Sequence, residues 1–327
     1  MTLPAERFAI GVDIGATKIA SVILSEQGEL VTSSQVLTLA DKGMEGVLDR
    51  VARQIIDLVR QTPGPVAGVG IGSPGKVDSD CGIVYDAVNL GWKEAPLVEA
   101  ISARIGNHLP LWVQKDANLN ALGEYYYGAG QGYEDFVYLG VGSGLGAGIL
   151  SNGQLITGAG WYAADVGHLS LDPDGADCVC GGRGCAELVA SGPGLVRVAR
   201  QMIAGESLKS ILAEIPALTA ADVLQAAEQE DAVALKAFRE VGRVLGIVMS
   251  ACTVILNPRR FVIGGGLGLA GFDYFLPSAR EELMRRTLPN HRGAMDIVPS
   301  RVESPAVGSA CLVWYALSGK MLKHKTS

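Results

Sequence analysis

The feature that most constrains this fold is an internal similarity between two glycine-rich stretches. Residues 12–30 read VDIGATKIASVILSEQGEL, and residues 139–155 read LGVGSGLGAGILSNGQL. Both predict an apolar strand, a glycine-rich turn, a second strand and a turn centred on Gly28 or Gly153. A period of about 125 residues is far longer than that of a solenoid. We therefore expect two duplicated domains that each offer a glycine-rich hairpin to one cleft. The alternative is a chance similarity between two hairpins.

Strands alternate with helices along the rest of the chain, which predicts an α/β fold. The length of 327 residues fits about two domains. We expect an N-terminal α/β domain over 1–117 and a larger C-terminal one over 118–305, with a helix at about 306–320 packing back on the first. The expected strands cover 7–14, 18–24, 29–38, 68–73 and 260–266, and the expected helices 46–61, 95–106, 186–204, 219–229, 232–256, 274–287 and 306–318.

Charge and patterning exclude several classes of protein. The net charge of −7 disfavours nonspecific nucleic-acid binding. The first residues lack the basic start and long apolar core of a signal peptide. The longest uncharged stretch, 136–164, contains eight glycines, so turns and short strands explain it better than a membrane helix. These features predict a soluble, cytoplasmic protein with no membrane or nucleic-acid partner.

Three glycine-rich turns are candidates for binding phosphate or nucleotide. In Asp13-Ile14-Gly15-Ala16-Thr17-Lys18, the turn N–H groups and the Thr17 hydroxyl can donate to phosphate, and Asp13 can hold Mg²⁺ or its waters. The second turn is Gly142-Ser143-Gly144, and the third is Gly264-Gly265-Gly266 after an apolar strand. The alternatives are a plain hairpin turn with a solvated aspartate, a glycine-rich bulge and a turn that leads into a helix.

Asp116 is the candidate catalytic group. Lys115-Asp116-Ala117-Asn118 lies between a short apolar run and a helix. In α/β folds the carboxyl end of a strand is where ligands bind, so this carboxylate can take a proton from an attacking hydroxyl. An aspartate at such a junction can equally be a helix N-cap.

His168, Cys178, Cys180 and Cys185 have the residue types and spacing of a zinc site. One imidazole and three thiolates complete a tetrahedral set and leave no open position for a metal-bound water, so the zinc is expected to be structural. The alternative is three buried cysteines and an unrelated histidine. Cys81, Cys252 and Cys311 lie in apolar contexts and are expected to be packing residues.

Taken together, these motifs resemble the ROK family of bacterial sugar kinases and sugar-responsive regulators over nearly the whole chain. The similar segments are GVDIGATK (11–18), GIGSPGKVD (70–78), VNLGW (88–92), KDANLNALGE (115–124), GVGSGLGAGI (140–149), GHLSLDPDGADCVCGGRGCAE (167–187) and NPRRFVIGGG (257–266). The resemblance implies an actin/hexokinase-like (ribonuclease H-like) fold, with two duplicated α/β domains around a cleft and a zinc-binding loop.

The resemblance also implies a phosphotransferase that moves the γ-phosphoryl group of Mg-ATP to a sugar hydroxyl, with structural Zn²⁺. Asp116 would be the general base, and glucose, through its 6-hydroxyl, the default substrate. N-acetylmannosamine, N-acetylglucosamine, fructose, allose or a cyclitol are the alternatives. The nucleotide and Mg²⁺ side would comprise Asp13, Gly15, Ala16, Thr17, Lys18, Gly142, Ser143, Gly144, Gly265 and Gly266. The sugar side would comprise Gly75, Asn89, Lys115, Asp116, Asp165, His168 and Glu187, with His168 also binding zinc. A homodimer or homotetramer is expected.

Three positions depart from the pattern of the family. Lys115 stands where an asparagine that binds the sugar is usual, Asp165 replaces a longer glutamate, and Ala16 replaces a glycine. Lys115 offers donors but no acceptor, and Asp165 reaches less far. These changes point to a different substrate, a Lys115–Asp165 ion pair or weakened catalysis. A catalytically silent sugar-binding member is therefore the runner-up. A regulator is disfavoured, because only about ten residues precede Gly11, too few for a helix-turn-helix.

Overall fold

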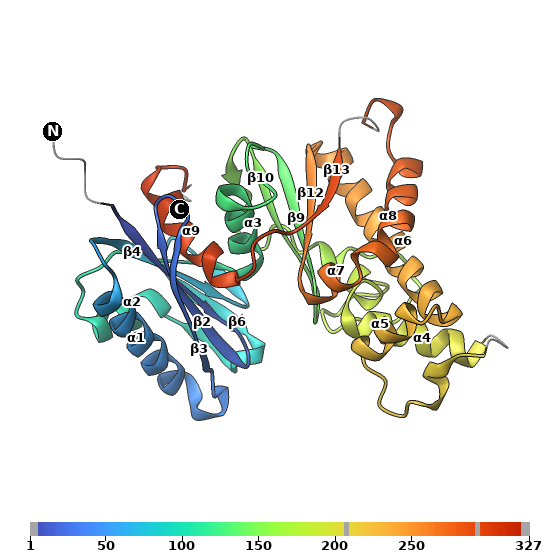
Figure 1. Ribbon diagram of the computed structural model, residues 1–327, viewed down its shortest axis with the longest axis horizontal. Coiled ribbons are helices and arrows are strands. Elements are labelled where there is room, and N and C mark those ends of the chain that lie inside the picture. The colour runs from blue at the N-terminus through green and yellow to red at the C-terminus, as the bar shows by residue number, and fades with distance from the viewer. Residues whose placement is uncertain (1–5, 206–208, 292–294, 322–327) are drawn as a thin grey trace. The chain divides into compact units, whose positions relative to one another are not determined.

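The structure is a computed structural model that describes residues 6–205, 209–291 and 295–321 (Figure 1). Internal contacts divide the chain into two units. The first comprises Met1–Glu134, Asn152–Ala163 and Arg301–Ser327, and the second comprises Asp135–Ser151 and Ala164–Ser300. The chain therefore leaves the first unit and returns to it twice.

The first unit is built on a five-stranded sheet with the order β3-β2-β1-β4-β8. Its strands are β1 (Phe8–Ile14), β2 (Lys18–Ser25), β3 (Leu30–Leu37), β4 (Val66–Ser73) and β8 (Leu111–Lys115). β1 pairs antiparallel with β2 and parallel with β4, and β4 pairs parallel with β8. The strands predicted over 7–14, 18–24, 29–38 and 68–73 are confirmed.

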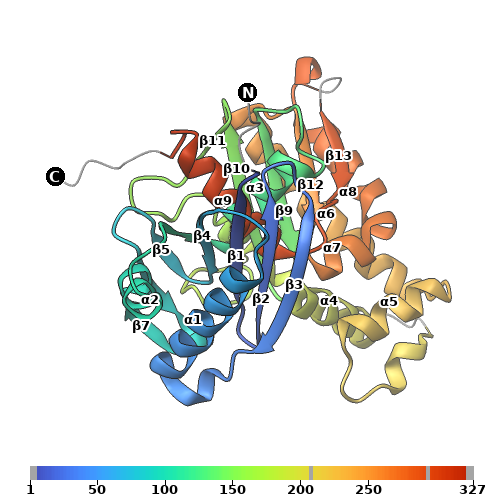
Figure 2. The same cartoon turned by 60° about the vertical axis from the view of Figure 1, so that its left-hand side comes forward.

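Helices cover both faces of this sheet. Ile10 and Val12 belong to the same buried cluster as Val51 and Ile55 of α1 (Gly43–Gln61), which crosses in front of the strands in Figure 2. Because side chains alternate along a strand, Gly11 faces the other side, where α9 (Pro305–Leu317) packs. A Cβ on Gly11 would lie 2.0 Å from the carbonyl oxygen of Ala306. The sheet and α9 thus pack backbone against backbone.

A small antiparallel sheet, not predicted from the sequence, follows β4. It contains β5 (Lys76–Asp78), β6 (Ile83–Ala87) and β7 (Trp92–Ala95), with the 3-10 turn η2 (Val88–Leu90) between the last two strands. A shorter helix than expected, α2 (Leu97–Ile105), comes next, because the first residue of the predicted 95–106 helix belongs to β7. The first unit also contains the 3-10 turn η1 (Ala40–Lys42).

The boundary between the units differs from the expected one after residue 117. The helix α3 (Asp116–Tyr127) belongs to the first unit, because it packs on α9 and is anchored there. The buried carboxylate of Glu124 accepts the backbone N–H groups of Arg301 and Val302 at 3.1 and 3.0 Å. α9 itself also lies in the first unit.

The second unit repeats the strand order of the first. β10 (Leu145–Ser151) pairs antiparallel with β9 (Phe136–Val141), which pairs parallel with β12 (Arg260–Gly264), which pairs parallel with β13 (Asp296–Pro299). In the sheet of the first unit, β2, β1, β4 and β8 are neighbours in this order, and their pairs have the same parallel and antiparallel directions as those of β10, β9, β12 and β13. The duplication inferred from the two glycine-rich stretches is confirmed, and each stretch forms the antiparallel hairpin of its sheet.

Five helices among the described residues complete the second unit. They are α4 (Gly192–Gly205), α5 (Ala220–Glu228), α6 (Ala232–Leu256), α7 (Gly266–Ala270) and α8 (Phe272–Arg286), with 3-10 turns η3 (Val166–His168), η4 (Ala186–Leu188), η5 (Ile211–Glu214) and η6 (Pro289–His291). α6 lies along α8 at close range, because Gly242 and Gly246 bring its backbone near carbonyl oxygens of α8. α5 begins with a reciprocal capping box between Thr219 and Asp222.

The continuous helix predicted over 186–204 is wrong in its first part. Residues 186–188 form a 3-10 turn, and α4 begins only at Gly192. The Ser191 hydroxyl accepts the N–H of Gly194 at 3.0 Å, which starts a new helix at this point.

The uncharged stretch 136–164 forms strands and turns, as predicted. It contains β9, β10 and the two-residue strand β11 (Gln154–Leu155). Within the described parts of the chain, none of the helices has both the length and the apolar character needed to span a bilayer.

Candidate active site

The first glycine-rich turn closes the hairpin between β1 and β2. The N–H of Gly15 donates to the carbonyl of Lys18 at 2.9 Å, and the Thr38 hydroxyl donates to the carbonyl of Gly15 at 2.7 Å. These bonds fix the turn, while Ala16, Thr17 and Lys18 are exposed at its tip. The turn is therefore rigid and open to a ligand.

Two predicted carboxylates, Asp13 and Asp116, meet at one edge of the first sheet. β1, β4 and β8 run parallel, so their carboxyl ends share this edge, and Asp13 and Asp116 lie at the ends of β1 and β8. Burial raises the pKa of Asp13 to about 7, and the negative charge of Asp116 contributes to the rise. Gly72 of β4 leaves room for Asp13, because a Cβ there would lie 2.7 Å from Asp13 Oδ1.

Asp116 is the first residue of α3 and is exposed to solvent. Its Oδ1 accepts the N–H of Ala117 at 2.7 Å, so it caps a backbone donor even though Lys115 occupies the N-cap position. The buried Gln114 supports this junction. Its Oε1 accepts the backbone N–H of Lys115 at 2.8 Å and the side-chain amide of Asn118 at 3.1 Å. The carboxylate is thus oriented by its own helix terminus, and its role as a base remains a prediction.

The other predicted sugar-side residues of the first unit lie around the small sheet. Gly75 has φ +92°, and a Cβ there would lie 2.7 Å from the carbonyl oxygen of Tyr85. Only glycine fits this tight connection between β4 and β5. Asn89 is exposed on η2.

The second glycine-rich turn, 142–144, closes the hairpin between β9 and β10 and is fixed by three hydrogen bonds. Gly142 N–H donates to Gly144 O at 2.9 Å, and the N–H of Gly192, at the start of α4, donates to Gly142 O at 2.8 Å. Leu145 N–H donates to Glu187 Oε2 at 2.8 Å. A Cβ on Gly144 would lie 2.5 Å from that oxygen. Glu187, predicted as a sugar ligand, therefore also supports the phosphate-type turn.

Gly265 and Gly266 lie beside this turn because β12 runs parallel to β9. Gly265 has φ +81°, and a Cβ there would lie 2.4 Å from the carbonyl oxygen of Val141. Gly266 begins α7 and has open space around its Cβ position. The structure therefore brings together the second and third predicted nucleotide segments.

The predicted zinc ligands also come together. One ligand atom from each of His168, Cys178, Cys180 and Cys185 lies within 4.8 Å of the others. Cys178 Sγ is 3.8 Å from His168 Nδ1, and the sulfurs of Cys180 and Cys185 are 3.6 Å apart. Ligands at about 2.0–2.3 Å from one tetrahedral zinc ion are separated by about 3.4–3.8 Å, so the residues fit Zn²⁺.

Asp165 and His168 lie on one turn of the second unit. The N–H of His168 donates to the carbonyl of Asp165 at 3.0 Å across η3. Because the Nδ1 atom of His168 faces the thiols, a zinc ion bound there would fix the imidazole and the adjoining turn.

Sequence reasoning missed two features of the first unit. One is the buried carboxylate of Glu124, which anchors α3 to the segment before α9 and could be recognised only once its burial was known. The other is a group of three aromatic rings around Lys76, from parts of the chain far apart in sequence.

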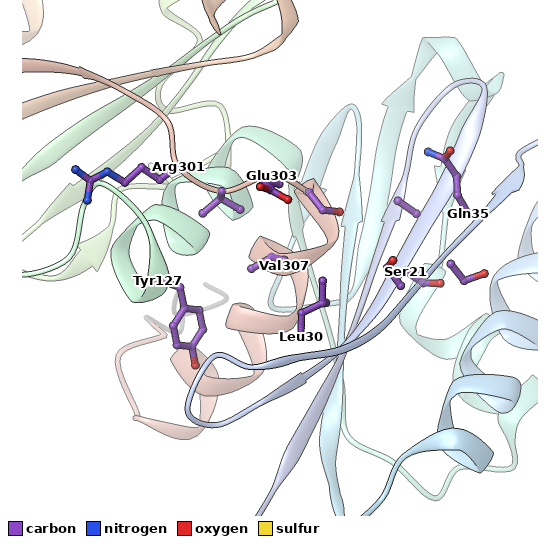
Figure 3. A pocket seen from close by; sticks show the side chains of 12 residues that line it. Ser21, Leu30, Gln35, Tyr127, Arg301, Glu303 and Val307 are labelled. Carbon is purple, nitrogen blue, oxygen red and sulfur yellow. The ribbon is translucent and has the colours of Figure 1, made fainter.

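A cavity of about 620 Å³, lined by β2, β3, Tyr127 and the segment 301–307, contains none of the predicted site residues (Figure 3).

Comparison with known proteins agrees with this arrangement. The model of the ROK family matches residues 9–315 of the chain. The chain belongs to the ROK family. A glucokinase of Thermotoga maritima is 34% identical over 95% of this chain and 98% of its own length.

Solved structures of ROK proteins show the same fold. A ROK glucokinase from Streptomyces griseus, in complex with glucose and AMPPNP, is 34% identical, with a TM-score of 0.78 over 93% of this chain and 98% of its own. A ROK transcriptional regulator, a homologue of the E. coli MLC protein, is 26% identical, with a TM-score of 0.85 over 96% of this chain and 79% of its own. The predicted actin/hexokinase-like fold is confirmed. Kinases and regulators share it, so function depends on the site.

Proposed function

We propose that the protein is an ATP-dependent sugar kinase that phosphorylates the 6-hydroxyl of glucose, with Asp116 as the general base. The observation that carries this proposal is the exposed Asp116 carboxylate beside the half-buried Asp13 at the carboxyl edge of the first sheet. The glucokinases of T. maritima and S. griseus support glucose as the acceptor and ATP as the donor.

In this reaction Asp116 accepts the proton of the sugar hydroxyl as its oxygen attacks the γ-phosphorus. The bond between that phosphorus and the bridging oxygen of ADP breaks, and ADP leaves with the electron pair. Asp116 suits this task because it is exposed and held by the N-terminus of α3. The turns at Gly15 and at 142–144 offer backbone N–H groups suited to the phosphates.

Asp13 fits a Mg²⁺ ion that accompanies the nucleotide. Among the described residues, no side chain donates a hydrogen bond to its carboxylate, and burial together with Asp116 disfavours its charged form. A divalent cation would neutralise this repulsion, and carboxylate oxygens are ligands that Mg²⁺ prefers. The ion would supply charge neutralisation for the transferred phosphoryl group.

The zinc ion has a structural role in this proposal. It would hold His168 through Nδ1 and tie the turn at Asp165 to the loop with the three cysteines. All four ligands come from the protein, so the ion does not activate water. Its contribution is to fix residues of the sugar side.

The test is a coupled assay of ADP release with Mg-ATP and a panel of hexoses, N-acetylhexosamines and cyclitols. We expect turnover with glucose, reduced at least about 100-fold in Asp116→Ala. Binding of glucose and ATP to that variant is measured by calorimetry to show that the site is otherwise intact. Equal turnover by Asp116→Ala would contradict the assignment of the base.

The second candidate is a sugar-binding member without kinase activity, which the similarity to the ROK regulator and the residues Lys115 and Asp165 favour. The same assay distinguishes the two. Sugar binding in calorimetry without ADP release from any sugar in the panel would establish this second function.

A further inference from the structure

Lys76, on β5 of the first unit, is surrounded by three aromatic rings. Its Nζ lies 5.5 Å from the ring centre of Tyr85, 5.7 Å from that of Trp161 and 4.7 Å from that of Tyr162. A cation within about 6 Å of a ring centre is attracted by the negative face of the ring. Tyr85 is the direct cross-strand partner of Lys76 in β6. Trp161 and Tyr162 belong to a loop more distant in sequence, so Lys76 joins two separate segments.

The loop that contains Trp161 has an unusual backbone. Trp161 has φ +61°, a conformation in which a bulky side chain is a genuine outlier. The loop is closed by Trp161 N–H to Gly158 O at 3.3 Å and by Ala163 N–H to Thr157 O at 3.1 Å. A strained residue persists only where its surroundings fix it. The cation–π contacts with Lys76 are an interaction outside the loop that does so.

The position of this loop connects it to the proposed sugar side. The loop ends at Ala163, the last residue of this segment in the first unit, and the chain enters the second unit at Ala164. Asp165 and His168 follow on η3. On the other side, Lys76 directly follows Gly75. Along the chain, the residues of the cluster therefore directly adjoin two segments that the proposed function assigns to the sugar.

We propose that Lys76 is a positioning residue, which holds the 157–163 loop on the β5–β6 hairpin and thereby pre-orders the segment with Asp165 and His168 for the sugar. This inference rests on the proposed kinase function and adds a determinant of sugar affinity. Removing the ammonium frees the loop, so the sugar must order it on binding. The KM for the sugar then rises, while the chemical step changes little.

The test compares Lys76→Met, which keeps the apolar stem, with Lys76→Arg, which keeps the charge. We expect Lys76→Met to raise the KM for the sugar about threefold to tenfold with kcat within about twofold, and Lys76→Arg to restore most of the affinity. Lys93→Met is the matched control, because Lys93 is an exposed lysine of β7 in the same small sheet. Its KM should equal that of the parent.

A second readout needs no turnover. The chain has four tryptophans. The fluorescence of Trp161 is therefore isolated by comparing acrylamide quenching in two proteins, one that keeps Trp161 and one that carries Trp161→Phe. We expect Lys76→Met to increase the quenching of Trp161 and Lys93→Met to leave it unchanged. If Lys76→Met fails to fold, Tyr162→Leu, which removes one exposed ring, replaces it with the same expectations.

The outcomes are distinct. Unchanged quenching in Lys76→Met would show that the lysine does not hold the loop, and increased quenching with an unchanged KM would show that the loop does not serve the sugar. Either result overturns the proposal, as does a fall in kcat at constant KM. A parent protein that turns over no sugar would refute the kinase function itself, and the quenching then decides whether Lys76 holds the loop.

Discussion

Asp13→Asn is expected to stabilise the protein at neutral and alkaline pH while it removes the predicted cation ligand. Asp13 has a pKa of about 7 against an ordinary value of 3.8. At about 1.4 kcal/mol for each pH unit, keeping this carboxylate charged in the folded state costs up to about 4 kcal/mol. The side chain is only half-buried, so we expect about half of this, about 2 kcal/mol.

The direction of the pH dependence follows from proton linkage. Between about pH 4 and pH 7 the folded state holds a proton on Asp13 that the unfolded state has released, so stability falls as the pH rises through this range. Above pH 7 the full cost applies. The advantage of Asp13→Asn should therefore be largest at pH 8 and shrink to less than about 1 kcal/mol at pH 4.5.

The assay is thermal unfolding of the parent and the variant at pH 4.5 and pH 8, without Mg²⁺ or nucleotide. A gain of about 2 kcal/mol corresponds to a midpoint about 4–8 °C higher at pH 8. Asp116→Asn should give a smaller gain, because the charge of Asp116 is the lesser cause of the shift. Asp57→Asn, at an exposed ion pair on α1, should give none.

Two results would refute this reasoning. If Asp13→Asn is no more stable than the parent at pH 8, the charged carboxylate does not have the free-energy cost that its burial implies. If the gain is the same at both pH values, the effect comes from packing and not from charge. Adding Mg²⁺ at pH 8 should raise the midpoint of the parent and leave that of Asp13→Asn unchanged.

Three further predictions concern the metal, the packing and the second turn. Elemental analysis should find about one zinc per chain, and Cys180→Ser should lose it and weaken sugar binding while leaving ATP binding intact. Gly70→Ala should lower the free energy of unfolding in denaturant by about 3 kcal/mol, because the new Cβ would lie 1.8 Å from an α9 carbonyl oxygen. Gly205→Ala, which has open space around the new Cβ, should leave this free energy unchanged or raise it. Glu187→Ala removes the acceptor of the Leu145 N–H and should raise the KM for ATP, measured at saturating sugar.

The fold was predictable where a local pattern determines it. The hairpin of each unit was located from the two similar glycine-rich stretches. The helix predicted over 232–256 is found as α6 with the same bounds, and Asn257 adopts a left-handed conformation at its end. The small sheet was missed because its strands have three to five residues, too few to establish a period.

The site was predictable only as a set of separate residues. The zinc ligands are close in sequence, and their types alone specify the chemistry. The support of the turn at Gly144 by Glu187 joins residues far apart in sequence, and the contact between Lys76 and Trp161 does the same. No local pattern marks such contacts, because loops and tertiary packing create them. Asp116 could be read as either a cap or a base, and the structure explains why, since its carboxylate caps Ala117 from an exposed position.

The duplicated scaffold also shows why topology alone does not give function. Asp13 pairs with Ala20 one position before the last pair of the β1–β2 hairpin, and Gly140 holds the same place in the β9–β10 hairpin, paired with Gly146. The same position thus carries a carboxylate in the first unit and no side chain in the second. The first hairpin is suited to a cation, and the second to close approach of a ligand to its backbone. Asp13→Asn makes this position of the first hairpin uncharged, as it is at Gly140 in the second, so the pH-dependent unfolding described above measures the cost of that one charge.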